Sequence, residues 1–322
     1  MVSRPDRRAT DQDYNNLSAK SKNSPGRILV ECSTALVFLV LRTINLLPYR
    51  VKISLGLGLG RLLYLLPTSR VDVARVNIGL CFPDLSEVER ETMVRDTFRH
   101  FGAGLIESAI SWWDNTAGIY AMTETRGLEH LEAAKAMGKG VVLLGAHFST
   151  LDLSAMLAAK HMEYYAIYRE QNNRVLNHIM KRGRERHMIS GIPHTSLVGA
   201  ARRVKQGNVL WYSADQDMGE DHSVYAPFFG HPAATITGVA RLARLTGAPL
   251  VMICTRRNED NSGYVVEYLP GPPDYPYDDE VANAGIINSL IEQGIRLAPA
   301  QYYWFHRRFK TQPGMEKGVL YR

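Results

Sequence analysis

The feature that most constrains the fold is an alternation of short apolar runs with helical segments, which begins at about Met122. We predict strands at 140–146, 163–168, 208–213, 249–255 and 263–269, and helical segments at 149–160, within 172–189, 196–206, 235–246 and 280–297. Repeated βα units are typical of a largely parallel sheet that helices cover on both faces. The sequence therefore predicts an α/β fold, with one domain over residues 67–322.

The chain before this domain divides into a polar and an apolar part. Residues 1–27 carry six Arg and Lys residues among polar ones, which predicts a disordered basic leader. Residues 28–66 are strongly apolar, but their uncharged stretch from Cys32 to Leu41 has only ten residues. A membrane span needs about 18.

A helical wheel of the first apolar segment is amphipathic. Glu31, Thr34, Phe38, Arg42 and Asn45 share one narrow sector and leave a wide apolar face. The pattern predicts a membrane-anchoring helical segment at 28–66, which lies in the interface or spans the bilayer. The alternative is an amphipathic helix that packs on the protein's own core.

Two local patterns predict helix contacts and helix ends in the first hundred residues. Gly56 and Gly60 stand four apart on an apolar helix, which favours close approach of a second helix over a nucleotide-binding loop. Ser86-Glu-Val-Glu89 is a capping box, and it predicts the start of a long helix that reaches towards Trp112.

Charge and cysteine content narrow the classes of partner. The chain has 38 basic and 32 acidic residues, and a net charge of +6 suits nucleic acid, anionic lipid or an acidic protein. Its three cysteines, Cys32, Cys81 and Cys254, form no CxxC pair and no metal-ligand spacing. We expect a reducing compartment, no disulfide and no metal.

His147 is the first candidate for chemistry. It follows a predicted strand, after Gly145 and Ala146, and ligands of α/β sheets bind beyond the carboxyl ends of strands. If the next helix starts at Ser149, Asp152 lies in its first turn and can fold back to the imidazole N–H, which frees the other ring nitrogen as a base. Equally, Ser149-Thr-Leu-Asp152 is a capping box in which Asp152 only satisfies backbone donors.

Missing motifs constrain the mechanism. The sequence has no G-x-S-x-G elbow, no H-E-x-x-H and no P-loop. A histidine–carboxylate pair without a protein nucleophile suits direct attack by a substrate hydroxyl, with His147 removing its proton. We expect neither a covalent enzyme intermediate nor a cofactor.

His147-x4-Asp152 resembles the H-x4-D/E motif of the glycerolipid acyltransferase superfamily. Further stretches resemble one branch, the late (lauroyl/myristoyl) acyltransferases of lipid A biosynthesis: Asn77-Ile-Gly-Leu-Cys-Phe-Pro83, Tyr168-Arg169, Asp215-Gln-Asp-Met-Gly219, Pro227-Phe-Phe-Gly230, Ala233-Ala-Thr235 and His306-Arg-Arg-Phe-Lys-Thr311. The similarity to this family spans roughly residue 28 to the end of the sequence.

The resemblance implies an enzyme of the bacterial inner membrane whose catalytic domain faces the cytoplasm. It would transfer an acyl chain from acyl carrier protein to a hydroxyacyl group of a lipid A precursor, Kdo-modified lipid IVA. His147 and Asp152 would be catalytic. The matching motifs give the predicted substrate-binding residues Arg169, Asp215, Gln216, Asp217, Phe229, Gly230 and Thr235.

Three of these residues have alternatives at the level of the sequence. Arg169 ends a strand predicted beside that of His147, so it would hold a substrate phosphate or carboxylate, or else form a buried ion pair with Asp215 or Asp217. Asp215 and Asp217 could bind a metal ion, but two carboxylates without further ligands are weak evidence for a metal site. The basic run at 306–310 would contact acidic headgroups or remain a solvated tail.

Two other functions compete with lipid A acylation. The same chemistry would serve another glycolipid or glycerolipid acceptor. A non-enzymatic anionic-membrane or nucleic-acid binder would explain the net charge, but the chain lacks nucleic-acid-binding motifs, so we expect no nucleic acid partner. Basic residues at 181–187 and 202–205 would dock acidic acyl carrier protein, or they are ordinary solvated helix faces.

Overall fold

The computed structural model describes residues 25–114 and 116–322. The leader predicted for residues 1–27 lies outside the described residues as far as residue 24. Its boundary needs correction, because helix α2 already begins at Pro25.

Seven strands form one sheet in the order β1-β9-β8-β2-β5-β3-β4. Their bounds are β1 Thr123–Arg126, β2 Val141–Gly145, β3 Tyr164–Tyr168, β4 Ser190–Pro193, β5 Val209–Ser213, β8 Leu250–Arg257 and β9 Tyr264–Pro270. Strands β8, β2, β5, β3 and β4 are parallel, whereas β9 pairs antiparallel with β8. The mostly parallel sheet confirms the predicted α/β fold class.

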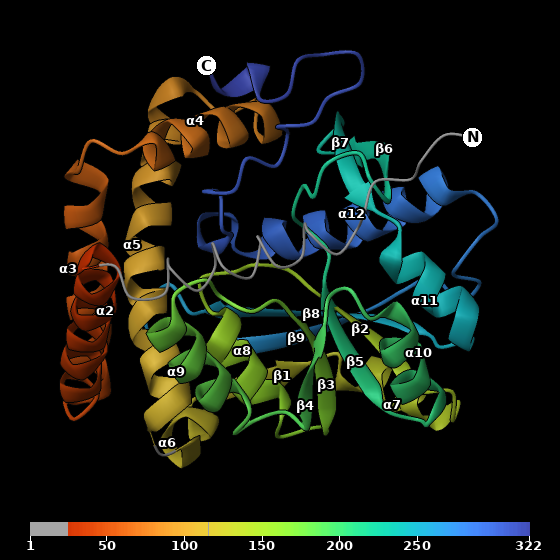
Figure 1. Cartoon of the computed structure of the whole chain (residues 1–322), viewed down its shortest axis with the longest axis horizontal. Coiled ribbons are helices and arrows are strands. Elements are labelled where there is room, and N and C mark those ends of the chain that lie inside the picture. Colours follow the sequence, from red (N-terminus) through yellow and green to blue (C-terminus); the bar gives the residue numbers. More distant parts are fainter. Residues whose placement is uncertain (1–24, 115) are drawn as a thin grey trace, which may run out of the picture.

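Helices cover both faces of this sheet (Figure 1). Their bounds are α2 Pro25–Ile44, α3 Tyr49–Leu65, α4 Ser69–Cys81, α5 Glu87–Trp113, α6 Thr116–Ala121, α7 Leu128–Ala136, α8 Leu151–Ala158, α9 Arg174–Arg184, α10 Leu197–Lys205, α11 Gly238–Thr246 and α12 Glu280–Leu297, with short 3-10 turns η2 Pro299–Gln301 and η3 Val319–Tyr321. Alternate residues of β2 belong to different cores: Val141 and Leu143 pack with α7 and α8, and Val142 and Leu144 with α10, α11 and α12. This period of two is expected for a strand that is buried on both faces.

The long helix α5 is the support for the N-terminal helices. Ser86 Oγ accepts a hydrogen bond from the Glu89 N–H, and the Glu89 carboxylate accepts one from the Ser86 N–H, so the predicted capping box is confirmed. The close approach at Gly56 and Gly60 is also confirmed: a Cβ on Gly60 would lie 2.2 Å from the Phe98 carbonyl oxygen of α5. Helix α3 therefore rests on α5 along its glycines.

The N-terminal pair α2–α3, defined here as residues 25–65, turns an apolar face outward. Phe38 of α2 is buried against Trp112 and Trp113 of α5. The opposite face exposes large apolar side chains: Leu29, Leu36, Leu39, Val40, Leu46, Leu62 and Leu65. Among the helices of residues 25–114 and 116–322, none is both long enough and apolar enough to cross a membrane.

The prediction failed between residues 223 and 237. Strands β6 Ser223–Phe228 and β7 His231–Ile236 form an antiparallel hairpin that turns at Phe229 and Gly230, and helix α11 starts only at Gly238. The helix predicted from residue 235 was wrong at its start because Thr235 pairs with Val224 in the hairpin. Strands β1 and β4 were missed because each has only four residues, without a continuous apolar run.

Candidate active site

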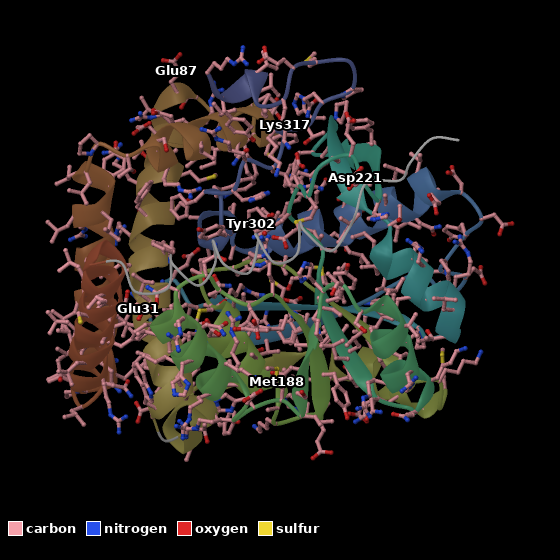
Figure 2. All side chains as sticks on the ribbon, in the orientation of Figure 1. Glu31, Glu87, Met188, Asp221, Tyr302 and Lys317 are labelled. Atoms are coloured by element: carbon pink, nitrogen blue, oxygen red, sulfur yellow. The ribbon has the colours of Figure 1, made fainter. Side chains whose placement is uncertain are left out.

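A cavity of about 970 Å³ opens at the carboxyl ends of β2, β3 and β5. His147 lines it, with apolar residues from both faces of the sheet and polar residues from loops. Figure 2 labels two lining residues that lie far apart in the sequence, Met188 and Asp221, and also Tyr302 near the centre of the molecule. The cavity lies where ligands of parallel sheets bind.

Asp215 is the hydrogen-bond partner of His147. Its Oδ1 lies 2.7 Å from His147 Nδ1, and its Oδ2 accepts the backbone N–H of His147 at 2.8 Å. The Tyr302 hydroxyl donates to the same Oδ2 at 3.0 Å. The Asp215 side chain is 1% exposed and that of His147 is 30% exposed, so the pair is fixed on its inner side and open to the cavity at the imidazole.

The register of the sheet explains this contact. Gly145 of β2 pairs with Ser213 of β5, so the residues two positions further along each strand end, 147 and 215, emerge at the same level. A side chain at position 145 would collide with Trp211, because a Cβ there would lie 2.1 Å from the indole nitrogen. The small Gly-Ala step therefore lets β2 end close against β5.

The pair shifts both pKa values towards the charged forms. Burial alone would lower the pKa of His147, but the Asp215 charge and hydrogen bond outweigh it, so the pKa lies above its usual 6.5. Burial would likewise raise the pKa of Asp215, but the same interactions lower it to about 2. Asp215 holds Nδ1, which leaves Nε2 available to a substrate in the cavity.

Asp152 occupies a different position from the one predicted. Its Oδ1 accepts a hydrogen bond from Arg184 Nε at 2.6 Å, and its Oδ2 accepts one from Ser108 of α5 at 3.1 Å. Both sequence interpretations of Asp152 were wrong, because Asp215 takes the imidazole, and Thr150 is the N-cap of α8, with no side-chain cap among the described residues. Helix α8 starts two residues later than expected and directs Asp152 towards α5 and α9.

Arg169 and Gln216 line the same cavity as His147. Strand β3, which Arg169 follows, is separated from β2 by β5, so the predicted adjacency was wrong although the shared cavity was right. The alternative of a buried ion pair was also wrong, since Arg169 is exposed, Asp215 binds His147, and Asp217 binds Thr311.

Asp217 holds the C-terminal segment against the loop that follows β5. Its carboxylate accepts hydrogen bonds from the Thr311 N–H at 2.9 Å and the Thr311 hydroxyl at 3.0 Å, and Lys310 donates to its carbonyl at 2.7 Å. Asp215 and Asp217 therefore bind different partners rather than a shared ligand. The described residues contain no group of three or more His, Cys, Asp or Glu that could hold a metal ion.

A family model of the bacterial lipid A biosynthesis acyltransferases matches residues 20–311. The chain is similar to three enzymes of Escherichia coli (strain K12). It is 38% identical over 268 residues to the lipid A biosynthesis lauroyltransferase (83% of this chain, 88% of the relative), 36% identical over 274 residues to the palmitoleoyltransferase (85% and 89%), and 28% identical over 276 residues to the myristoyltransferase (84% and 85%).

This chain belongs to the lipid A biosynthesis acyltransferases. The resemblance drawn from the motifs is thereby confirmed, and the protein is an acyltransferase. The competing interpretation as a non-enzymatic binder is discarded.

Three predicted site residues of this acyltransferase lie away from the His147 cavity. Phe229 and Gly230 line a second cavity of about 420 Å³, with Phe82 and Arg296 among its other lining residues. Thr235 is fully buried, and its hydroxyl accepts a hydrogen bond from Arg308 at 2.9 Å. The structure therefore places these motifs outside the lining of the cavity that contains His147.

The basic C-terminal run is also structural in its centre. Arg308 is 2% exposed and donates to the Ala234 carbonyl and to Asn288. His306 accepts the Asp217 N–H through Nε2, and burial lowers its pKa to about 4, so it is neutral. Neither headgroup contact nor a solvated tail describes Arg308.

Sequence reasoning missed three residues of the candidate site around His147. Tyr302 belongs to no sequence motif that indicates a role, because only the tertiary structure brings its hydroxyl to Asp215. The sequence analysis assigned Arg184 to the basic residues predicted to dock acyl carrier protein. In the structure it forms an ion pair with Asp152, and both residues line the cavity. Arg241, an exposed residue on α11, lines the cavity and had no motif to reveal it.

Proposed function

We propose that this acyltransferase moves a fatty acyl chain from acyl carrier protein to a hydroxyacyl group of Kdo-modified lipid IVA, with His147 as general base and Asp215 as its partner. The observation that carries the mechanism is the pair itself, in which a buried carboxylate fixes Nδ1 while the imidazole faces a large cavity. The nature of donor and acceptor follows the family resemblance and the cavity's basic rim.

The step requires no protein nucleophile. His147 Nε2 takes the proton of the acceptor hydroxyl while the hydroxyl oxygen attacks the thioester carbonyl carbon. The tetrahedral intermediate then collapses, the carbon–sulfur bond breaks, and the imidazolium returns the proton to the leaving thiolate. Asp215 stays ionised throughout and stabilises the imidazolium, as its low pKa favours.

The polar residues that line the cavity suit a phosphorylated acceptor. Arg169 and Arg241 are exposed cations that line the cavity, and Gln216 adds an amide next to Asp215 in the sequence. Guanidinium groups bind phosphate oxygens in a bidentate way, which gives orientation as well as affinity. Arg169 and Gln216 therefore stay in the proposed substrate-binding set.

Reconstitution tests the proposal. Purified protein would be incubated with acyl-acyl carrier protein and Kdo-modified lipid IVA, and mass spectrometry would follow the gain of one acyl group. A glycerolipid acceptor and lipid IVA without Kdo serve as comparisons. Equal transfer to a glycerolipid would contradict the proposed lipid A acceptor. Transfer that is unaffected by His147→Ala would contradict the proposed role of His147 as general base.

We infer that the α2–α3 pair holds the enzyme on the cytoplasmic face of the inner membrane. Leu36 and Leu39 are each 62% exposed on a helix whose other face packs on α5. A wide apolar face of this kind lies favourably in a bilayer interface. Replacing both with Glu should move the protein to the soluble fraction, because charges at lipid-facing positions are costly.

A matched control separates the anchor from general surface effects. Met137 and Val198 are also exposed, at 58% and 74%, but lie outside the α2–α3 pair. Their joint replacement by Glu should leave the protein with the membranes. Membrane retention of the Leu36 and Leu39 variant, with loss of its folded structure, would assign α2 to the core instead.

Only some of the basic residues at 181–187 and 202–205 are free to dock acyl carrier protein. Arg184 is committed to Asp152, and His187 lies 2.6 Å from the Ser111 carbonyl, whereas Arg182, Arg202 and Arg203 are exposed. Reversing these three to Glu should raise the KM for acyl carrier protein and flatten its salt dependence, since exposed charges steer encounter. Reversal of Arg126, an exposed residue of the edge strand β1, is the control; an unaltered KM in the triple variant would place docking elsewhere.

A further inference from the structure

One polar contact connects the N-terminal pair to the mouth of the acyl-transfer cavity. The chain between β3 and α9 lines this cavity through residues 169–172, here named the rim. Asn173, the next residue, donates a hydrogen bond from Nδ2 to the Thr34 hydroxyl of α2 at 2.8 Å. Segments 139 positions apart in the sequence meet at this bond.

Both partners are fixed within their own helices. The Thr34 hydroxyl lies 2.7 Å from the Val30 carbonyl, to which it donates, so it accepts from Asn173 with a fixed orientation. Asn173 is the N-cap of α9, and its Oδ1 accepts the Leu176 N–H at 3.0 Å. The amide of Asn173 thus uses one end to start α9 and the other to bind α2.

The rim is tied to the same helix start. Asn177 of α9 accepts hydrogen bonds from the Gln171 N–H at 2.9 Å and from the Tyr168 hydroxyl at 2.7 Å. A displacement of the α9 start relative to α2 therefore moves the rim as well. Thr34 sits on the packed side of α2, one turn before buried Phe38, while the other side of the helix is apolar and exposed.

We propose that Asn173 and Thr34 are positioning residues that hold the cavity rim in register with the membrane-bound face of α2, so that a lipid acceptor embedded in the bilayer reaches His147 past this rim. The inference rests on the proposed function, because it assumes a membrane-embedded acceptor. Neither residue contacts His147 or Asp215 in the described structure, so the bond affects delivery of the acceptor and leaves the chemical step intact.

Kinetics in two settings tests the bond. Thr34→Val removes the hydroxyl that accepts the hydrogen bond while keeping the shape of the side chain. Asn173→Ser keeps a side-chain oxygen at the N-cap while removing the amide that donates the hydrogen bond. With acceptor in phosphatidylethanolamine–phosphatidylglycerol vesicles, each variant should raise the acceptor KM by about five-fold, the ratio that follows from one hydrogen bond. The kcat, and the KM in detergent micelles, should stay at the wild-type value.

Chain-specific controls distinguish positioning from a structural loss. Ser33→Ala removes a neighbouring hydroxyl that donates to the same Val30 carbonyl at 3.0 Å, and it should leave every constant unchanged. Thr34→Ser keeps the hydroxyl and should restore the wild-type KM. The double variant should be no worse than either single one, as expected for one shared interaction. Equal defects in vesicles and micelles, or a fall in kcat, would overturn the inference.

Hydrogen exchange provides a readout that does not depend on catalysis. Binding to the same vesicles, without acceptor, should protect the rim and the α9 start, residues 169–176, in the wild type and in Ser33→Ala. The protection should be lost in Thr34→Val. Wild-type protein that binds vesicles without protection of this segment would refute the coupling. Failure of acyl transfer alone, with the protection present, would instead refute the proposed acceptor.

Discussion

The two carboxylates near His147 behave in opposite ways. Asp152 lies five residues along the chain and binds Arg184 and Ser108, whereas Asp215 lies 68 residues away and binds the imidazole, its backbone N–H and Tyr302. The former is in the first turn of α8, the latter just after β5. Proximity in sequence did not decide which carboxylate binds the His147 imidazole.

Charge compensation explains the division of roles. The Arg184 guanidinium neutralises Asp152, and the pKa of Arg184 is raised because the Asp152 charge outweighs the effect of burial. Asp215 has no cation other than an imidazolium within hydrogen-bond distance in the described residues, so its charge is directed at His147. Asp152 still raises the pKa of His147 through space, but less than Asp215 does.

Removal of the base should have the largest effect. His147→Ala should lower kcat/KM at least ~100-fold, the usual range for a lost general base. Melting temperature should fall only modestly, because the backbone N–H of residue 147 and the Tyr302 hydroxyl still donate hydrogen bonds to the buried Asp215. Steady-state kinetics and circular dichroism measure both quantities. Cys254→Ala, which changes a buried thiol outside the cavity lining, is the control and should retain turnover.

The second prediction concerns Asp215. Asp215→Asn should lower kcat/KM by about 100- to 10,000-fold, because the imidazole loses its fixed tautomer and the stabilisation of its cation. In the wild type, activity should fall as pH drops through the His147 pKa, which lies above 6.5. In the variant this acid limb should move to lower pH, since burial then acts without the opposing charge. A pH–rate profile measures the shift.

The comparison would be reversed by one result. If Asp152→Asn moved the acid limb further than Asp215→Asn, Asp152 would be the partner of the imidazole during turnover.

A smaller and different effect is expected at Asp152. Asp152→Asn leaves the Arg184 guanidinium without its counter-charge in a partly buried site, which should lower the free energy of unfolding by about 2 kcal/mol, as for the loss of a hydrogen bond between charged groups. Turnover should fall ~10-fold at most, with the acid limb nearly unmoved. Chemical denaturation gives the stability, and Asp152→Asn combined with Arg184→Gln should recover part of it.

The smallest effect is expected at Tyr302. Tyr302→Phe removes one hydrogen bond to Asp215 and should lower kcat/KM about five-fold, as a loss of ~1 kcal/mol implies. Neighbouring Tyr303→Phe is the control, because its ring packs against Phe101 and Phe305 rather than at the pair. Equal losses in the two variants, measured by steady-state kinetics, would mean that the Tyr302 hydroxyl has no specific role.

Local pattern alone determined much of this molecule. The apolar runs predicted β2, β3, β5, β8 and β9 within a few residues, and the segment at 280–297 is helix α12 with the same bounds. The capping box at Ser86 and the glycines of α3 were also readable, because each acts within one or two turns of helix. His147 was found because a strand end that is followed by a helix places its loop at the edge of the sheet.

Tertiary structure decided the partners. Strand order placed β5 beside β2, and only this pairing brings residue 215 level with residue 147. Arg184, Tyr302 and the Thr34–Asn173 contact follow from packing between distant segments, for which a single sequence carries no periodic signal. Hydrogen-bond partners depend on three-dimensional distance, and spacing along the chain predicts that distance only within one element of secondary structure.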